Sequence, residues 1–399
     1  MTGQNVFLAK LALSFLLFGP VIAIYAYLGY PALLKLISLI LANPVRAREP
    51  DTWPFISITI PVYNEERVIG ATLDALLAAD YPADRRQILV VSDASTDRTD
   101  EIVRGYADRG VELLRMPVRG GKTAAENAAL QNLRGDIVVN TDASVRIAPA
   151  ALKLLLARFS DPEIGVASGR DVSVARAPGD SNLGESQYVG YEMWVRDLES
   201  RVGSLVGASG CFYAILRELH VTLFPSALSR DFACALIAHE HGYRAVSVNE
   251  AICYVPRVQS LQREYTRKVR TLTRGLETLW YKRSLMNPLR YGLFAWMLAS
   301  HKLVRWLAPW GLALAGLGCL LLAVAWRSVV PAAVFLLPLL LAAAGWVWPE
   351  NRRAPRFVAV PAYVVSGIVA ALEAWPRALR RELNPVWEPT RREPVVPKV

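Results

Sequence analysis

The sequence predicts an α/β domain with a mostly parallel sheet, flanked at both ends by transmembrane helices. Strand-like and helix-like segments alternate with short connections between residues 55 and 142, as in sheets covered on both faces. Hydrophobic residues make up 53% of the 399-residue chain and concentrate in residues 11–45 and 289–376. The stretch between these two regions carries charges throughout, as a globular domain does.

Three runs without a charged residue have the length needed to cross a bilayer: 11–34, 306–326 and 328–349. The first is too long for a signal peptide and no cleavage site follows it, so we interpret it as a permanent anchor. A fourth apolar stretch, 357–372, has arginines on both sides. The positive-inside rule therefore favours three spans and a re-entrant or interfacial segment over a fourth, short span.

These features predict four parts of the chain. They are a transmembrane anchor (1–45), a soluble domain (46–285), an interfacial helix with a membrane block (286–376) and a basic tail (377–399). Arg46 and Arg48 follow the first span, whereas Lys10 alone precedes it, so the soluble domain is expected in the cytosol.

Composition excludes several other classes of protein. The net charge of +10 suits contact with anionic membrane lipids, and no basic-aromatic motif for nucleic acid is present. The four cysteines form no close pair, which argues against a disulfide framework or a zinc site.

The soluble domain opens with four predicted strands, 55–62, 87–92, 111–116 and 136–141. Helical patterns at 68–79, from about 98 to 110 and at 123–133 separate them. Such sheets bind ligands at the carboxyl ends of their strands. The polar residues that follow these strands, Tyr63, Glu65, Asp93 and Asp142, therefore predict a binding site at that edge.

The motifs of this block resemble those of the family-2 glycosyltransferases, inverting enzymes with the GT-A nucleotide-sugar-binding fold. The match covers about 55–285 and keeps the family's order. The matching segments are 60–66, 90–97, 120–123 with Asn127, 140–144, and 230–232 ahead of 242–244. The resemblance implies a nucleotide-diphosphate sugar as donor.

The resemblance assigns five residues to the donor. Pro61, Tyr63 and Glu65 would border the nucleobase, unless they only form a strand-to-helix turn. Asp93 matches the base-reading aspartate, whose carboxylate can accept the imide N–H of uracil, which favours a UDP-sugar; the alternative is a helix cap. Lys122 would neutralise donor phosphate or be an ordinary surface lysine, since the spacing of a Walker loop is absent.

Asp142 and Ala143 occupy the family's Asp-x-Asp motif, which holds a divalent metal against the donor pyrophosphate. Ser144 stands in place of the second carboxylate. Mg²⁺ or Mn²⁺ takes oxygen ligands and accepts one or two protein carboxylates with phosphate and water oxygens. We therefore expect Asp142 to be the metal ligand, with weaker ligation by the protein than in the family.

Asp231 resembles the catalytic base, which takes the proton of the acceptor hydroxyl as it attacks; the alternative is a partner for the helix dipole. The small residues of loop 207–213 lie where the family places its acceptor site. Arg267 and Arg270 share a helix face and could close over the donor phosphates, or they could anchor an amphipathic helix at lipid headgroups. The Gln-x-x-Arg-Trp motif of processive relatives is absent.

The sequence thus predicts a multi-pass inner (plasma) membrane glycosyltransferase, whose cytosolic domain glycosylates a lipid-linked or growing polysaccharide acceptor. One alternative is a processive synthase that extrudes its polymer, which with so few spans needs a homo-oligomer or an export partner. Another is an inactive membrane scaffold or nucleotide sensor. Ser144 favours that alternative, and the joint presence of Asp93, Asp142 and Asp231 opposes it.

Overall fold

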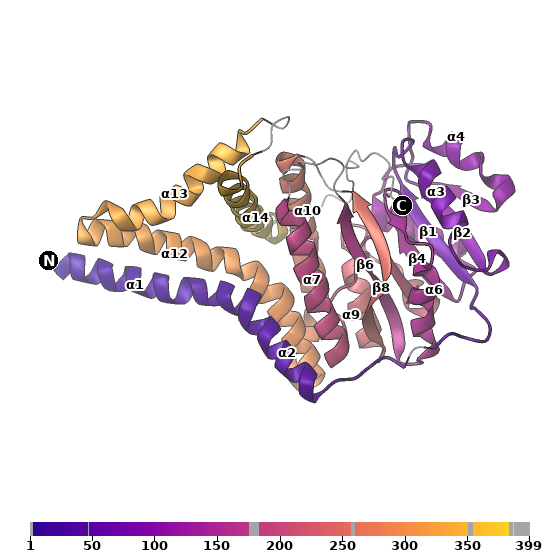
Figure 1. The fold of residues 1–399 in the computed structure, drawn as a ribbon, viewed down its shortest axis with the longest axis horizontal. Helices are drawn as coiled ribbons and strands as arrows, with labels where there is room; N and C mark the ends of the chain where they lie inside the picture. The colour runs from indigo at the N-terminus through magenta and orange to yellow at the C-terminus, as the bar shows by residue number, and fades with distance from the viewer. Residues whose placement is uncertain are drawn as a thin grey trace.

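The computed structural model describes residues 3–46, 48–174, 183–256, 260–349, 354–382 and 386 (Figure 1). In this part of the chain eight strands form one sheet in the order β3-β2-β1-β4-β7-β6-β8-β5. The strands are β1 (Ile56–Val62), β2 (Arg86–Ser92), β3 (Val111–Arg115), β4 (Ile137–Thr141), β5 (Arg146–Ile147), β6 (Ile164–Val174), β7 (Phe212–Leu216) and β8 (Arg244–Pro256).

The four strands expected from the sequence are parallel to one another, so the α/β fold with its parallel half is confirmed. The other half makes the whole sheet mixed, because β7 runs antiparallel to both β4 and β6. Its register pairs Phe212 with Thr141. The loop that enters β7 therefore lies beside the residues that follow β4.

The sheet is buried on both faces. Ile88 and Val90 of β2 pack into one core cluster, and the alternate residues Leu89 and Val91 pack into the other. The helices of the domain are α3 (Ile69–Leu77), α4 (Thr99–Arg104), α5 (Lys122–Ala129), α6 (Ala151–Leu156), α7 (Leu183–Val202), α8 (Arg217–His220), α9 (Arg230–Glu240) and α10 (Leu261–Tyr281).

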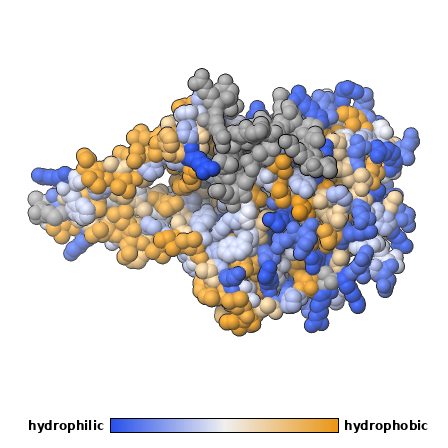
Figure 2. All heavy atoms as spheres, viewed as in Figure 1, coloured by the Kyte–Doolittle hydropathy of each residue, from blue (hydrophilic) through white to orange (hydrophobic). Residues whose placement is uncertain are grey.

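Four helical segments of the described chain are long and apolar enough to cross a membrane: Gly3–Ile40, Pro288–Trp326, Val329–Trp346 and Arg356–Leu379. They comprise α1 (Gly3–Ile24) with α2 (Tyr30–Ile40), α11 (Pro288–Leu298) with α12 (Arg305–Trp326), α13 (Val329–Trp346) and α14 (Arg356–Leu379). Figure 2 shows apolar side chains along α1, α12 and α13, which extend away from the sheet domain. Helices at both ends of the soluble domain are thus confirmed.

The stretch 357–372, expected to be a re-entrant or interfacial segment, lies within one helix, and three spans rather than four stays a prediction. α14 is one continuous helix, longer than the apolar run, and it packs against α10 and α13. The ammonium of Lys268 lies 3.6 Å from the ring centroid of Tyr363, and the Tyr265 hydroxyl bonds to Glu373. Because a helix satisfies its own backbone groups, it needs no break at membrane depth. Most of the predicted basic tail, 377–399, lies outside the described residues.

α1 and α12 pack at backbone contact. A Cβ built on Gly19 would lie 2.4 Å from the carbonyl oxygen of Gly311, and one on Gly311 would lie 2.4 Å from that of Gly19. Small residues permit this approach between membrane helices. Each of the two long segments also contains a π-helical turn, η1 (Tyr25–Gly29) and η7 (Ala299–Val304), a rare geometry that often marks functional sites.

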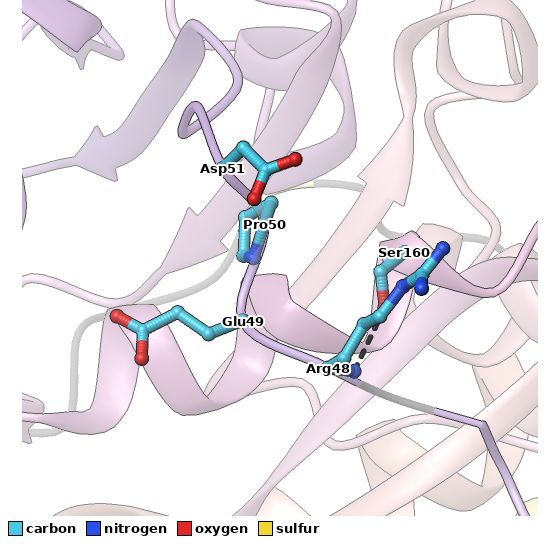
Figure 3. Close-up of a pocket in the computed structure, with 5 residues that line it drawn as sticks. All are labelled: Arg48, Glu49, Pro50, Asp51 and Ser160. Atoms are coloured by element: carbon cyan, nitrogen blue, oxygen red, sulfur yellow. Dashed lines mark hydrogen bonds between the residues drawn. The ribbon is translucent and has the colours of Figure 1, made fainter.

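The linker between α2 and β1 is fastened to the domain. The backbone N–H of Arg46 donates to Asp161 (3.0 Å), and that of Arg48 donates to the Ser160 hydroxyl (3.0 Å). A shallow pocket at this junction is lined by Arg48, Glu49, Pro50, Asp51 and Ser160 (Figure 3). None of the predicted site residues lines this pocket. It lies where these hydrogen bonds join the linker after α2 to the sheet domain.

Candidate functional site

The loops after β1 and β2 are joined by hydrogen bonds. Asn64 and Ala94 both adopt positive φ (52° and 57°), a sparsely populated region for residues other than glycine. The Asn64 side chain accepts from the N–H of Thr96 (2.8 Å) and donates to its hydroxyl (3.1 Å). Two neighbouring turns thus support each other directly after Pro61, at the predicted ligand edge.

Tyr63 extends this edge, and the guanidinium of Arg119 lies 3.6 Å from its ring centroid. A stacked cation and ring make a flat surface suited to a planar base. Arg119 was not singled out from the sequence, because cation–π pairing between distant loops leaves no local pattern. The backbone N–H of Glu65 donates to the Thr99 hydroxyl (2.8 Å).

The aspartate that binds the first residue of α4 is Asp97, not Asp93. Asp97 accepts from the N–H and the hydroxyl of Thr99. The fully buried Asp93 instead accepts from the N–H of Gly120 (2.6 Å) and of Gly121 (2.8 Å). The capping alternative for Asp93 is thus excluded, and its role in reading the base stays a prediction.

Asp93 fixes the turn that starts α5. Gly121 has φ +91°, a conformation that other residues rarely adopt, and a Cβ on Gly120 would lie 2.8 Å from that of Ala124. Both glycines are therefore required by the turn. Lys122 is the next residue after these glycines. The hydrogen bonds from Gly120 and Gly121 to Asp93 therefore set the direction of the Lys122 side chain.

Lys122 and Asp142 form the centre of the site. The Lys122 ammonium donates to Asp142 Oδ1 (2.6 Å) and to the carbonyl of Gly210 (2.9 Å). Burial alone would lower the pKa of this ammonium, but the carboxylates of Asp142, Glu126 and Asp231 outweigh it and hold the pKa well above its usual value. Lys122 is thus a permanently charged site residue, and the surface-lysine alternative is excluded.

Asp231 approaches the same loop from α9. A Cβ on Gly210 would lie 2.2 Å from Asp231 Oδ2, and Asp231 Oδ1 accepts from the N–H of Phe232 (2.9 Å). Only glycine leaves room for the carboxylate at this position. The structure therefore brings together Lys122, Asp142 and Asp231 around Gly210, three groups that lie on separate elements.

A buried carboxyl beneath this centre was missed from the sequence. Glu126 lies one turn after Lys122 in α5, with its side chain 1% exposed and 3.9 Å from the Arg230 guanidinium. Burial raises the pKa of Glu126 to about 6, although Lys122 and Arg230 act in the opposite direction. A single Glu among alanines resembles a solvated helix position, so nothing in the sequence marks it as buried.

The arginines of α10 have other partners. Arg274 donates to the Thr123 hydroxyl (3.0 Å) and to the carbonyls of Ala227 and Leu228, which ties α10 to the start of α5. Arg267 forms a bidentate ion pair with Glu264 in its own helix. Closure of Arg267 and Arg270 over the donor stays a prediction.

A divalent ion would meet one protein carboxylate here. Asp142 has its side chain 33% exposed, and in the described chain its Oδ2 atom accepts no hydrogen bond. Ala143 is buried behind it. The described residues contain no group of three or more His, Cys, Asp or Glu arranged to hold a metal. The site therefore fits a hard ion that takes its other ligands from phosphate and water.

Comparison with known proteins gives concordant matches. Residues 57–220 match the model of glycosyl transferase family 2. An N-acetylglucosaminyltransferase of Rhizobium sp. (strain N33) is 28% identical over 223 residues, 51% of this chain and 48% of the relative. A beta-monoglucosyldiacylglycerol synthase of Synechocystis is 32% identical over 130 residues, 31% of this chain and 27% of the relative. The chain thus spans about half or less of the length of these curated relatives.

A solved structure is similar along nearly the whole chain. It is the mannosyltransferase PcManGT from Pyrobaculum calidifontis in complex with GDP-Man and Mn²⁺, with a TM-score of 0.70 at 23% identity. The match covers 94% of this chain and 99% of that one, so the likeness in fold includes the apolar helices.

Proposed function

We propose that this chain, whose residues 57–220 match the model of glycosyl transferase family 2, transfers a sugar with inversion from a nucleotide-diphosphate sugar to a membrane-held acceptor. The observation that carries the proposal is the convergence of Lys122, Asp142 and Asp231 around Gly210. Such a site has a cation for a diphosphate, a carboxylate for a metal and a separate carboxylate for a proton.

The proposed roles follow from these positions. Asp231 takes the proton of the acceptor hydroxyl while that oxygen attacks the anomeric carbon opposite the leaving nucleotide. Lys122 stabilises the negative charge of the leaving diphosphate. Asp142 would hold Mg²⁺ or Mn²⁺, which when bound offsets charge on the same diphosphate. Asp93 and the Tyr63–Arg119 stack are placed to bind the base, and a UDP-sugar is our first candidate donor.

A lipid-linked or polysaccharide acceptor at the cytosolic face fits the apolar helices on both sides of the domain. Relatives with names for N-acetylglucosamine transfer and for glycolipid synthesis are compatible with either acceptor.

The test uses the detergent-purified full chain with a panel of UDP- and GDP-sugars, Mn²⁺ and a membrane lipid extract. We expect transfer of radiolabel from one donor, and slow hydrolysis of that donor without acceptor. Asp108→Asn, an exposed change outside the site, serves as control. A protein that binds a donor but neither hydrolyses nor transfers it would be a nucleotide sensor, and the proposal would be wrong.

A further inference from the structure

A polar cluster lies between the membrane helices and the loop that enters β7, residues 207–211, called here the catalytic loop after its place in the proposed function. Glu199 of α7 accepts from the hydroxyl of Tyr30 (2.6 Å) and contacts His301 Nδ1 (2.5 Å). Glu192, two turns earlier, contacts His301 Nε2 (3.1 Å) and accepts from Arg305 (2.6 Å). The cluster therefore joins the first membrane segment, α7 and the π-turn η7.

Lys302, the next residue of η7, is a cation without a hydrogen bond in the described chain. Its side chain is 12% exposed, and its nearest carboxylate oxygen, on Glu192, is 3.9 Å away. The ammonium lies 5.4 Å from the ring centroid of Phe232 and 3.4 Å from the Cβ position of Gly207. An ammonium held only by a long ion pair has donors left for an anionic ligand that brings its oxygens closer.

The carboxylates nearby are already used. Glu192 faces three basic side chains, Arg305 (2.6 Å), Arg196 (3.4 Å) and Lys302 (3.9 Å). Glu199 is committed to Tyr30 and His301. The remaining carboxylate, Asp171 of β6, interacts with Arg196 and accepts from the Ser209 hydroxyl (2.6 Å). None of them brings an oxygen within hydrogen-bond distance of Lys302.

Buried donors of two arginines are also unpaired. In the described chain Nε and Nη1 of Arg196, and Nε and Nη2 of Arg305, have no hydrogen-bond partner. A buried polar atom without a partner is rare in native proteins. Both arginines pair with Glu192, the carboxylate that Lys302 also approaches, so the cluster has spare N–H donors.

The catalytic loop has an ammonium at each end. Lys122 binds the carbonyl of Gly210, and Lys302 lies against Gly207. Asp231 contacts Gly210, and Phe232, the next residue, faces Lys302. In the proposed function the donor diphosphate binds at the Lys122 end of this loop. We therefore assign the opposite end, at Lys302, to the acceptor that Asp231 deprotonates.

We propose that Lys302 binds a phosphate group of the acceptor, which makes the acceptor a phosphate-bearing lipid. This proposal rests on the proposed function and names its substrate class. A phosphate oxygen is an acceptor that forms short, charge-assisted bonds with an ammonium. Lys302 belongs to the segment Pro288–Trp326, a candidate membrane span, so it reaches the loop from the membrane side, where a lipid phosphate would lie.

The test measures binding of farnesyl phosphate, farnesol, inorganic phosphate and UDP to the purified full chain in detergent by calorimetry. Wild type should bind farnesyl phosphate more tightly than farnesol. Lys302→Met should weaken farnesyl phosphate binding by about tenfold or more, the loss expected of one hydrogen bond to a charged group. Lys302→Arg should retain most of the binding, and UDP affinity should not change in any variant.

The control is Lys35→Met, which removes an exposed positive charge from membrane helix α2. It should leave farnesyl phosphate binding unchanged, which separates a site from general attraction to the charged surface. Competition by millimolar inorganic phosphate would show that free phosphate also enters the site; its failure to compete would assign the site to the lipid form alone.

Three results would overturn the inference: wild-type affinity for farnesyl phosphate in Lys302→Met, an equal loss for farnesol, or a parallel loss of UDP binding. If Lys302→Met does not purify as a folded protein, Lys302→Gln replaces it in each comparison. Transfer to a neutral acceptor with intact UDP binding would contradict the phosphate site while leaving the glycosyltransferase function in place.

Discussion

At the residue scale, the position of the Asp231 carboxylate depends on glycine at position 210. The Oδ2 atom occupies the space that a Cβ at 210 would need. Neither residue can change without moving the other, and the same loop carbonyl holds Lys122. The proposed proton acceptor and the proposed phosphate-binding cation therefore share a single backbone support.

We expect Asp231→Asn to reduce transfer by about 10²–10⁴-fold while donor affinity stays near wild type, because an amide cannot accept the hydroxyl proton. Asp142→Asn should weaken donor binding in Mn²⁺ as well as turnover, since it removes the carboxylate proposed to hold the ion. Calorimetry with UDP beside radiolabel transfer distinguishes the two variants. More than about a tenth of wild-type transfer in Asp231→Asn would place the base elsewhere.

Turnover should require a divalent ion despite Ser144. Excess chelator should abolish transfer, and Mn²⁺ or Mg²⁺ should restore it with weak apparent affinity, because Lys122 competes for Asp142. Ser144→Asp should lower the metal concentration needed for half-maximal activity. Full activity in chelator would show that Lys122 alone stabilises the leaving diphosphate.

Glu126 should make stability depend on pH. Its folded pKa of about 6 lies above the usual 4.5, so the folded state holds the proton more tightly and the contribution of Glu126 to stability falls as pH rises through this window. Lys122 and Arg230 face this carboxyl, as do Asp142 and Asp231. The melting temperature of Glu126→Gln relative to wild type should therefore rise between pH 4.5 and 6 and level off above. A difference that does not change with pH would contradict this.

The positions of Asp93 and Asp142 after strands, and of Asp231 at the start of a helix, could be predicted from the sequence, and their roles stay predictions. The partners of those residues could not. Glu126 and Arg119 reach the site through contacts between elements far apart in the chain. Likewise, the sequence left Lys122 undecided between surface and site, because the partners that bury it, Asp142 and Gly210, come from other segments.

At the scale of elements, the two long membrane segments pack through glycine and bend at π-turns. The period of the apolar pattern predicts that a segment is helical, whereas a π-turn adds one residue to the turn without altering composition. The parallel strands were predicted correctly for a related reason: each is a short apolar run with its own turn signal. The antiparallel direction of β7 depends instead on the path of the chain before it, which no local pattern records.

Gly311→Ala should lower the melting temperature of the detergent-purified chain, because the added Cβ would lie 2.4 Å from the Gly19 carbonyl oxygen. Overpacking of this kind destabilises by about 1–3 kcal/mol. Gly190→Ala in α7 is the matched control, since nothing lies within 4 Å of its Cβ position. That control should be neutral or slightly stabilising, since alanine favours a helix. Equal melting temperatures for both variants would mean that α1 and α12 separate easily.

At the scale of the whole molecule, the amino-terminal end of α1 and the turn between α12 and α13 lie together, far from the sheet domain (Figure 1). The core of this contact is formed by Ala9, Ala12, Leu322 and Ala325. We therefore expect the amino-terminal end of α1 and the α12–α13 turn on one side of a membrane, and the sheet domain on the other side.

Labelling of single cysteines in intact cells tests this topology. We expect Gln4→Cys and Arg327→Cys to react with an impermeant maleimide from outside, and Arg104→Cys to react only after lysis. Glu382→Cys reports on α14, because external labelling there would mean that this helix crosses the membrane. Each site is exposed in the structure. Labelling of Arg104→Cys in intact cells would reverse the predicted orientation.

The fastening of residues 46 and 48 to the domain has a consequence for which molecules can be glycosylated. A catalytic domain on a slack tether could sweep the space above the bilayer and reach hydroxyls at many heights. Here the tether has no slack on either side of the domain, since α10 also packs on α14. In the proposed function, the reacting centre would therefore stand at one height above the lipid surface, and acceptors would be selected by how far their hydroxyl protrudes from it.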